Sequence, residues 1–503
     1  MFSPSANQPA PFRPSITAWI IFALAVVLFL AHAQYYRPWV EDDTYISLQY
    51  ARHLVQGQGL VFNPGEKVEG FSNPSWVLLG ALAMVLKQDP LAFLQVVGML
   101  CGLVVLWLSW RLATDLMDRP TAVTALAPLV LALTPMLPRH SVTGLETALF
   151  TAGLLAAVFG LGRGASGARL VWGLAGLVVL VTTRPEGMAL ALVPALWRWW
   201  AHGRQERGAV LAILTAGATA VALLAARWLY FGDWVPNTFH AKVSASPRGV
   251  FEGVLYTVDF LRDSGGGALV LFFLALLLFR DSRRLLSLLA VTVGLMVLVV
   301  LAAGGDWMHL YRFYVPIYPL LVAGATAGAG RLHGALVGHL HRPLLVAGVL
   351  GAGALMALLN TYKEEKETVR RVMPHVLAGH HLVDAYRETG LWLRENSAPE
   401  DRVAVSDIGM IGYAGERAVV DMFGLIDPHI ARAAGRQHFK SDPAHVLARD
   451  PRFVVLVRDA AGGYLRVPDM AMAATPEFAA RYALVRSFRV EYSDEWVDVY
   501  RRK

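Results

Sequence analysis

Two adjacent aspartates, Asp42 and Asp43, follow the first long apolar run of the chain. They open the stretch DDTYISLQYARHL, whose apolar residues recur with a helical period and predict an amphipathic helix along a membrane surface. A carboxylate beside another carboxylate and near apolar surface can serve as a general base toward a hydroxyl group. The pair therefore predicts proton abstraction, and the alternative is that it only caps the helix that follows.

A second set of polar residues lies within this stretch or beside later apolar runs. Ionisable side chains next to a membrane are costly to bury, so they are candidates for function. Arginine binds a phosphate through two parallel hydrogen bonds, and lysine binds it as a point charge. We expect a site for an isoprenoid phosphate and its sugar, with substrate-binding residues Arg52, Glu146, Arg184, Glu186, Asn237, His240, Lys242, Asp306, His309 and Arg312.

Each member of this set also has an ordinary structural explanation. Arg184 could extend toward the membrane surface or pair with Glu186. Asp306 could simply end a helix after two glycines. Three later aspartates are equally ambiguous, because turns and ligand sites both favour aspartate at strand ends; they are Asp407, Asp421 and Asp427.

Two histidines, His240 and His309, raise the question of a metal site. The sequence offers no third ligand at a recognisable spacing. Cys101 is the single cysteine, which excludes a cysteine-based metal site and an intramolecular disulfide. The sequence therefore identifies no cofactor and leaves a divalent cation open.

Most of the elements that position these residues are expected to be membrane helices. Of the 503 residues, 55% are hydrophobic, against about 45–50% in a soluble domain. A helical span needs about 20 apolar residues. The expected spans are 17–34 (an uncleaved anchor), 92–110, 120–137, 145–162, 209–227, 285–303, 313–330 and 342–359, with two short spans in 170–200, a short run at 266–280 and a partial or interfacial helix at 74–87. The total is about eleven crossings.

Basic clusters give the orientation of these helices. They lie at 197–207, 280–284 and 330–342, and such clusters mark cytoplasmic loops. The net charge of +7 is thereby explained without nucleic-acid binding. The polar residues singled out above then all fall on the opposite, outer face, and this convergence favours function over accident.

The composition changes after about residue 360. RVAVSDIGMIGY and RFVVLVRD are typical of short buried strands, and RSFRVEYSDEWVDVYRR alternates like a strand pair. TYKEEKETVRR (361–371) is expected to be helical. We therefore expect a polytopic helical membrane module over 1–360, with an acidic first outer loop at 35–73, and a soluble periplasmic α/β domain over 361–503.

Several ordered segments resemble one family of membrane enzymes. EDDTYISLQYARHLVQGQGLVFNPGEKVEGFSNPSWVLL, GLETALF, TRPEG, PNTFHAK and GGDWMHLYRFYVPIYP, followed by VSDIGMIGY and VVDMFGLIDP, are similar to glycosyltransferases of the GT-C superfamily. Within it they resemble the mycobacterial AftB-type arabinofuranosyltransferases and their bacterial relatives. The resemblance runs from about residue 40 to about 430. One departure is Gln49, which stands where an arginine is commoner.

The resemblance implies an activity and a place in the cell. It implies an inverting transferase in the bacterial inner membrane that takes a sugar from a polyprenyl-phosphate donor to a cell-envelope glycan or lipid-linked acceptor on the periplasmic face. It also implies that the catalytic acid is the first of the two aspartates, Asp42. A departing phosphate needs stabilising cations and no general acid. The identity of the sugar does not follow.

Other functions on the same scaffold are a lipid-linked glycan carrier, a flippase, an assembly partner or a small-molecule transporter. A transporter is expected to show paired broken helices or repeats, with polar groups at the middle of the membrane. The expected crowding of polar residues at one face favours chemistry at the membrane surface instead.

Overall fold

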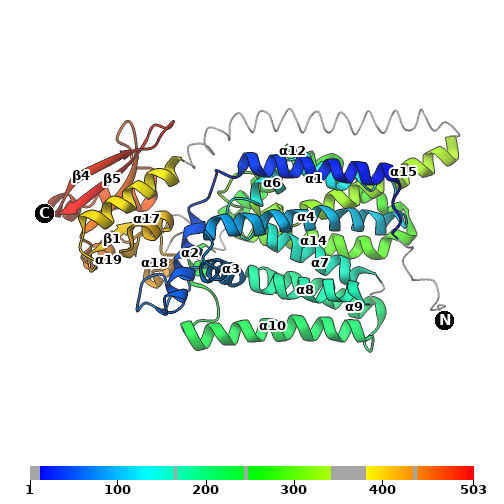
Figure 1. Cartoon of the computed structure of the whole chain (residues 1–503), viewed down its shortest axis with the longest axis horizontal. Coiled ribbons are helices and arrows are strands. Elements are labelled where there is room, and N and C mark those ends of the chain that lie inside the picture. Colours follow the sequence, from blue (N-terminus) through cyan, green and yellow to red (C-terminus); the bar gives the residue numbers. More distant parts are fainter. Residues whose placement is uncertain (1–11, 164–166, 243–246, 341–380, 434, 436–438) are drawn as a thin grey trace.

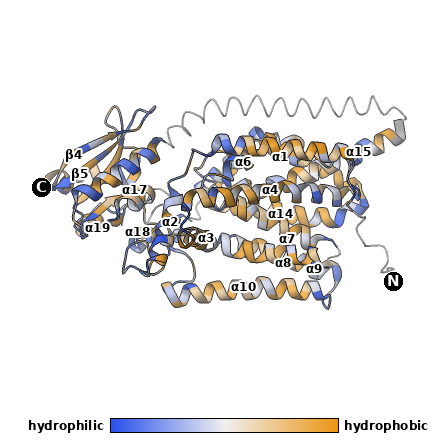
Figure 2. Cartoon of the chain, in the orientation of Figure 1, coloured by the Kyte–Doolittle hydropathy of each residue, from blue (hydrophilic) through white to orange (hydrophobic). Residues whose placement is uncertain are grey.

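A bundle of long helices and a small sheet-containing domain lie end to end (Figure 1). The computed structural model describes residues 12–163, 167–242, 247–340, 381–433, 435 and 439–503. The bundle is strongly hydrophobic along its length, whereas the C-terminal domain mixes polar and apolar residues (Figure 2). The expected division into apolar helices and a smaller α/β portion is present.

Within the described residues, five helices are long and apolar enough to cross a membrane, or six if one pair bent by 83° forms a single span. The five are α1 (Ile16–Tyr36), α4 (Pro90–Met117), α10 (Arg207–Phe231), α14 (Arg283–Ala303) and α15 (Tyr318–Leu340). The bent pair is α12 (Pro247–Asp263) and α13 (Gly266–Ala275). Shorter helices of the bundle are α3 (Pro74–Val85), α7 (Thr147–Gly162), α8 (Ala168–Thr183) and α9 (Gly187–His202).

One expected span is wrong. Residues 120–137 contain α5 (Leu126–Leu133), which ends at Thr134, and α6 (Met136–His140) begins after Pro135. Eight residues rise only about 12 Å, which is too short to cross a bilayer. Proline lacks the amide hydrogen that would continue the helix. The span expected at 342–359 and the helix expected at 361–371 lie outside the described residues, and the total of about eleven crossings stays a prediction.

The close packing of α7 on α8 brings the first polar residues together. A side chain at Gly160 of α7 would lie 2.2 Å from the backbone nitrogen of Gly173, and one at Gly176 of α8 would lie 2.5 Å from that of Ala157. Small residues let two membrane helices approach to backbone contact. Because the helices are antiparallel, Glu146 at the start of α7 lies beside Arg184 at the end of α8.

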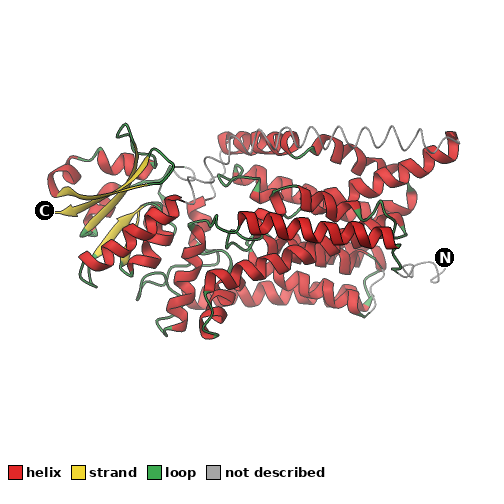
Figure 3. Ribbon diagram, turned by 45° about the horizontal axis from the view of Figure 1, so that its top comes forward, coloured by secondary structure: helices red, strands yellow, loops and turns green. Residues whose placement is uncertain are grey.

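The C-terminal domain is built on a five-stranded mixed sheet (Figure 3). Its strands are β1 (Arg402–Val405), β2 (Ala418–Asp421), β3 (Phe453–Asp459), β4 (Tyr482–Arg489) and β5 (Glu495–Arg502), in the order β2-β1-β3-β5-β4. Strand β1 pairs in parallel with both β2 and β3. Strand β5 pairs antiparallel with both β3 and β4. The strand expected in RFVVLVRD and the strand pair near the C-terminus are confirmed. In RVAVSDIGMIGY only Arg402–Val405 is a strand, and the apolar residues after Asp407 form a buried helix instead, because a short buried apolar run does not by itself distinguish strand from helix. The helices that follow β1 in this domain are α17 (Ile408–Gly415), α18 (Pro428–Arg432), α19 (Pro443–Ala448), α20 (Val467–Ala473) and α21 (Pro476–Arg481).

The helix after the two aspartates, α2 (Asp43–Val55), is packed against protein over most of its length. Every residue from Thr44 to Ala51 is buried, and so is His53. Its apolar side chains share one hydrophobic core with α3 and with strands and helices of the C-terminal domain. The polar side chains Gln49 and His53 are buried too, and Gln49 lies within hydrogen-bonding distance of His53 and accepts a bond from Arg52. The expected division of α2 into one buried apolar face and one exposed polar face is therefore not present.

The loop after α2 joins the same domain by hydrogen bonds. Asn63 donates its side-chain amide to the carbonyl of Val419 (2.8 Å) and accepts from the backbone N–H of Val419 (2.9 Å). The side chain thus replaces a neighbouring strand at the edge of β2. Farther along the loop, Glu69 accepts two 3.0 Å bonds from Arg227 of α10, and both side chains are buried.

Replacing Asn63 by alanine is expected to destabilise the protein by about 1–3 kcal/mol, because two buried backbone groups of Val419 lose their partner. Thermal unfolding of the full chain in detergent would measure this change. Asn396→Ala is the matched control, since that exposed side chain only donates to a carbonyl of its own helix and the substitution should cost less than about 0.5 kcal/mol. Equal effects of the two substitutions would contradict the role given to Asn63.

Candidate functional site

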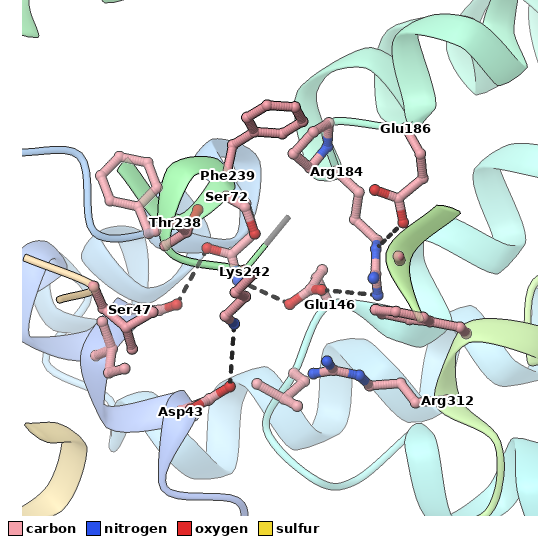
Figure 4. Close-up of a pocket in the computed structure, with 18 of the residues that line it drawn as sticks. Asp43, Ser47, Ser72, Glu146, Arg184, Glu186, Thr238, Phe239, Lys242 and Arg312 are labelled. Carbon is pink, nitrogen blue, oxygen red and sulfur yellow. Dashed lines mark hydrogen bonds and ion pairs between the residues drawn. The ribbon is translucent and has the colours of Figure 1, made fainter. Parts of the chain in front are cut away.

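A cavity of about 490 Å³ lies where the bundle meets the C-terminal domain (Figure 4). Its wall combines α2, the turn at 70–73, the start of α7, the turn between α8 and α9, the short helix α11 (Asn237–Lys242), the end of α14 and the segment around Arg312. Six of the residues expected to act in catalysis or binding line it: Asp43, Glu146, Arg184, Glu186, Lys242 and Arg312. Segments far apart in the sequence therefore converge as expected.

One wall of this cavity is apolar and belongs to α14. Met296, Val299, Ala302 and Ala303 line it. Their spacing of three or four residues puts them in one stripe along the helix. The stripe extends from the charged residues into the membrane-spanning part of α14.

Arg184 lies between two carboxylates (Figure 4). Its Nε donates to Glu186 at 2.6 Å, and its Nη1 lies 3.4 Å from Glu146. The pairing with Glu186, which the sequence left open as the structural alternative, is thus present. Arg184 keeps only 8% of its side chain exposed, yet it lines the cavity.

Arg312 is anchored from behind the cavity. It donates two hydrogen bonds to Asp306, at 2.6 and 3.1 Å. The Asp306 side chain is 1% exposed and is not among the residues that line the cavity. Asp306 therefore positions Arg312 instead of meeting a bound molecule.

Lys242 and Asp43 form the most accessible charged pair in the cavity. Their closest atoms, Nζ and Oδ2, are 3.9 Å apart, at the limit of an ion pair. The side chains retain 33% and 24% exposure. Both charges are thus available to a bound molecule, whereas Arg184 and Arg312 are held by short hydrogen bonds.

Asp42 points away from this cavity and binds the C-terminal domain. Its two carboxylate oxygens accept the backbone N–H groups of Gly409 (3.0 Å) and Met410 (2.7 Å), in the first turn of α17. Asp42 precedes α2 but makes no capping bond there, so the expected cap exists on a different helix. Burial raises the pKa of Asp42 to about 8, and the charge of Asp407 adds to the shift against these two donors.

A second cavity of about 430 Å³ adjoins the first at the junction with the C-terminal domain. Asp43 and Lys242 line both cavities, and Asp42 lines only the second. The C-terminal domain supplies polar groups to it through Asp407 and Arg466, which are joined by a 3.0 Å bond. Trp307 and Phe439 add large, half-exposed aromatic rings.

Four residues expected to bind substrate have structural contacts elsewhere. Arg52 lies over the ring of Tyr413 and 3.4 Å from Glu416. The other three are Asn237, which donates to the carbonyls of Gly424 and Leu425, His240, 3.3 Å from Asp233, and His309, which is not among the residues lining either cavity. Asn237 holds the two protein parts together. Over the described chain, no three histidine, cysteine, aspartate or glutamate side chains are placed to hold a metal ion.

Two further residues of the first cavity, Ser47 and Asn73, were not expected from the sequence. Asn73 donates to Glu146 at 2.8 Å and accepts from Ser47 at 3.2 Å. Asn73 precedes a proline, which is typical of a turn, and Ser47 lies inside a helix, so neither position by itself points to a binding site. Both act through Glu146, so their roles depend on a contact across 73 positions of the chain.

A pH titration of stability should detect the contact of Asp42. A carboxyl group whose pKa is higher in the folded protein stabilises the fold at acidic pH and loses that contribution as pH rises through about 8. Asp42→Asn stays neutral throughout. The melting temperature of wild type relative to this variant should fall by several degrees between pH 5 and pH 9, and parallel profiles would contradict the assignment.

Gly409→Ala tests the same contact from the other side. The added methyl group would lie 2.1 Å from the backbone oxygen of Asp42, so one chain must move. We expect a lower melting temperature at every pH and faster proteolysis of the C-terminal domain. Gly217→Ala is the control, since Gly217 also lies in a helix without positive φ and an added methyl group there meets no atom within 4 Å.

Sequence comparisons find similar proteins over part of the chain. Residues 376–500 match a family described as a domain of unknown function, DUF8728. The chain is 30% identical over 275 residues to the terminal beta-(1->2)-arabinofuranosyltransferase of Mycobacterium tuberculosis, covering 49% of this chain and 41% of that relative. It is 28% identical over 380 residues to the protein of the same name from Corynebacterium glutamicum, covering 64% and 53%. The chain thus spans about half the length of these relatives.

The structural comparisons cover nearly the whole chain. ArnT from Cupriavidus metallidurans, solved bound to undecaprenyl phosphate, has a TM-score of 0.54 and 13% identity, covering 96% of this chain and 98% of that one. The oligosaccharyltransferase of Archaeoglobus fulgidus, solved with a tethered acceptor peptide, has a TM-score of 0.53 and 10% identity, covering 95% and 74%. The expected fold class is confirmed: this chain has the GT-C fold and resembles the AftB-type arabinofuranosyltransferases in sequence.

Proposed function

We propose that this protein transfers a sugar from a polyprenyl-phosphate donor to a cell-envelope glycan, with inversion at the anomeric carbon. The observation that carries the proposal is a single cavity with cations at one end and an apolar stripe leading into the membrane part. A polyprenyl phosphate has the same two parts in the same order. The sequence similarity to arabinofuranosyltransferases and the fold shared with ArnT support a glycosyl transfer.

In this proposal the donor phosphate binds between Lys242, Arg312 and Arg184. Lys242 is the most exposed of the three, and the carboxylate beside it is 3.9 Å away. It can therefore approach the phosphate as negative charge develops on the departing oxygen. The lipid chain follows the stripe of Met296 and Val299 on α14.

Asp43 is the proposed general base. It faces the donor cavity and also lines the second cavity, so an acceptor hydroxyl there would lie between Asp43 and the sugar. The hydroxyl proton passes to Asp43, the oxygen bonds to the anomeric carbon, and the bond from that carbon to the phosphate oxygen breaks. Its electron pair leaves with the phosphate, so no general acid is needed. Asp42 has both carboxylate oxygens engaged by backbone N–H groups and is less suited to this role.

The second cavity is the proposed acceptor site. A glycan end is neutral and rich in hydroxyl groups, so it is bound by paired charged groups and by stacking on aromatic rings. Asp407, Arg466 and Trp307 offer such contacts. With the basic loops in the cytoplasm, this cavity and the C-terminal domain face the periplasm of a bacterial inner membrane.

Asp43→Asn is expected to lower transfer roughly 10²–10⁴-fold, the usual contribution of a general base. Asp42→Asn should remain at least about tenfold more active than Asp43→Asn, since it removes a docking contact and not the base. The assay is transfer from synthetic polyprenyl-phosphate sugars by purified protein, together with restoration of a surface glycan in a deletion strain. A fully active, folded Asp43→Asn would reject this mechanism. The reverse order of the two variants would favour Asp42 as base.

Lys242→Met is expected to raise the donor KM by roughly tenfold, because one charge-assisted contact to phosphate is lost. Lys242→Arg should recover most of the affinity. Lys67→Met is the control, since Lys67 is an exposed cation of the same face that stacks on Tyr230. An unchanged donor KM in Lys242→Met, with Lys67→Met behaving alike, would remove Lys242 from the donor site.

A further inference from the structure

Helices α4 and α7 end, and α8 begins, at the end of the bundle opposite the C-terminal domain (Figure 1). These elements carry a pair of arginines. Arg111 belongs to α4 and Arg169 to α8. Both guanidinium groups approach the ring of Phe159 on α7, at 5.1 and 4.3 Å from its centre. The pair takes no part in the cavities described above.

Aromatic rings enclose this pair. The guanidinium of Arg111 also lies 4.3 Å from the ring centre of Phe12 and 5.0 Å from that of Trp107. Trp107 contacts Trp172, whose ring borders the same region and is 36% exposed. Rings attract the faces of a guanidinium group but accept few of its N–H bonds.

The charges at this place do not balance. Arg169 donates to Asp115 at 2.8 Å. Over the residues that the structure describes, Arg111 has no ion pair, and its Nε and the Nη1 of Arg169 are buried without a hydrogen-bond acceptor. Two guanidinium groups therefore share one carboxylate in an apolar setting. Such a surplus charge is costly unless an anion joins it.

The depth of the pair identifies the kind of anion. Arg111 stands 21 positions after Pro90, the first residue of α4, and a helix rises about 1.5 Å per residue. The two levels are thus about 32 Å apart, which matches a hydrocarbon core of about 30 Å. Since the start of α4 lies at the end of the bundle that carries the catalytic cavity, Arg111 lies at the headgroup level of the other leaflet. Aromatic rings also gather at this level of a bilayer.

We propose that Arg111 and Arg169 bind the phosphate group of an anionic phospholipid on the membrane face opposite the catalytic cavity. The phosphate supplies the negative charge that the two guanidinium groups lack and binds at the parts of Arg111 and Arg169 that remain accessible, while Trp107 and Trp172 contact the glycerol and upper acyl region. This site is separate from the proposed donor site and does not depend on transferase activity. Its role is to fix the ends of α4 and α8 at one membrane surface.

The test uses full-length protein in a neutral detergent, with phosphatidylglycerol as the probe and phosphatidylcholine as the uncharged comparison. Retention of lipid is measured by native mass spectrometry, and its effect on the melting temperature is measured in parallel. We expect phosphatidylglycerol to be retained and to raise the melting temperature more than phosphatidylcholine. Arg111→Met with Arg169→Met should weaken retention roughly tenfold or more.

Two further variants keep the result interpretable if the double variant does not fold. Asp115→Asn removes the competing carboxylate and should strengthen phosphatidylglycerol binding. Arg204→Met, at an exposed arginine that stacks on Trp199 at the same end, should leave binding unchanged. Equal retention of both lipids, or unchanged binding in the Arg111 and Arg169 variants, would overturn the proposal. An equal effect of inorganic phosphate would replace the lipid by a free anion.

Discussion

The first turn of α17 rests on the carboxylate of Asp42, and the geometry of the whole junction depends on this contact. Gly409 has to lack a side chain, because a methyl group there would lie 2.1 Å from the backbone of Asp42. Asp407, at the N-cap position of α17, makes no capping bond and instead accepts bonds from Tyr386 and Arg466. One aspartate of the membrane module thus caps a helix of the C-terminal domain. The aspartate that would normally do so is left to line the second cavity.

This contact also separates the roles of two neighbouring aspartates. Consecutive residues at a helix start project in different directions, about 100° apart. When Asp42 is held by α17, Asp43 is turned toward Lys242 and the first cavity. The C-terminal domain therefore does more than cover the site, since its docking determines which carboxylate is exposed there.

The first cavity is lined by equal numbers of cations and carboxylates, and they are paired with different strengths. Arg184 and Arg312 each hold a carboxylate by a short bond, so they stay in place whether the cavity is empty or filled. Lys242 alone of these cations is loosely paired. For the proposed donor, fixed cations would position the phosphate, while the more accessible ammonium of Lys242 would follow the charge as it develops. At the far end of the bundle, Arg111 and Arg169 share the single carboxylate of Asp115. The net positive charge there favours binding of an anion.

The sequence by itself determined the helical bundle, the α/β composition of the C-terminal part and a set of polar candidates expected at one face; the structure selected from that set the six that line the first cavity. These follow from local properties: apolar runs of sufficient length, turns at proline and glycine, and basic loops that orient the helices. It favoured Asp42 over Asp43 only through the family resemblance, and it could not exclude a span at 120–137 or show that both faces of α2 are largely buried in protein. Only the tertiary structure decided these points, because each depends on a contact with residues distant in sequence. Asp42 accepts a hydrogen bond from the backbone of Gly409, 367 positions later in the chain, and no local sequence pattern predicts that contact.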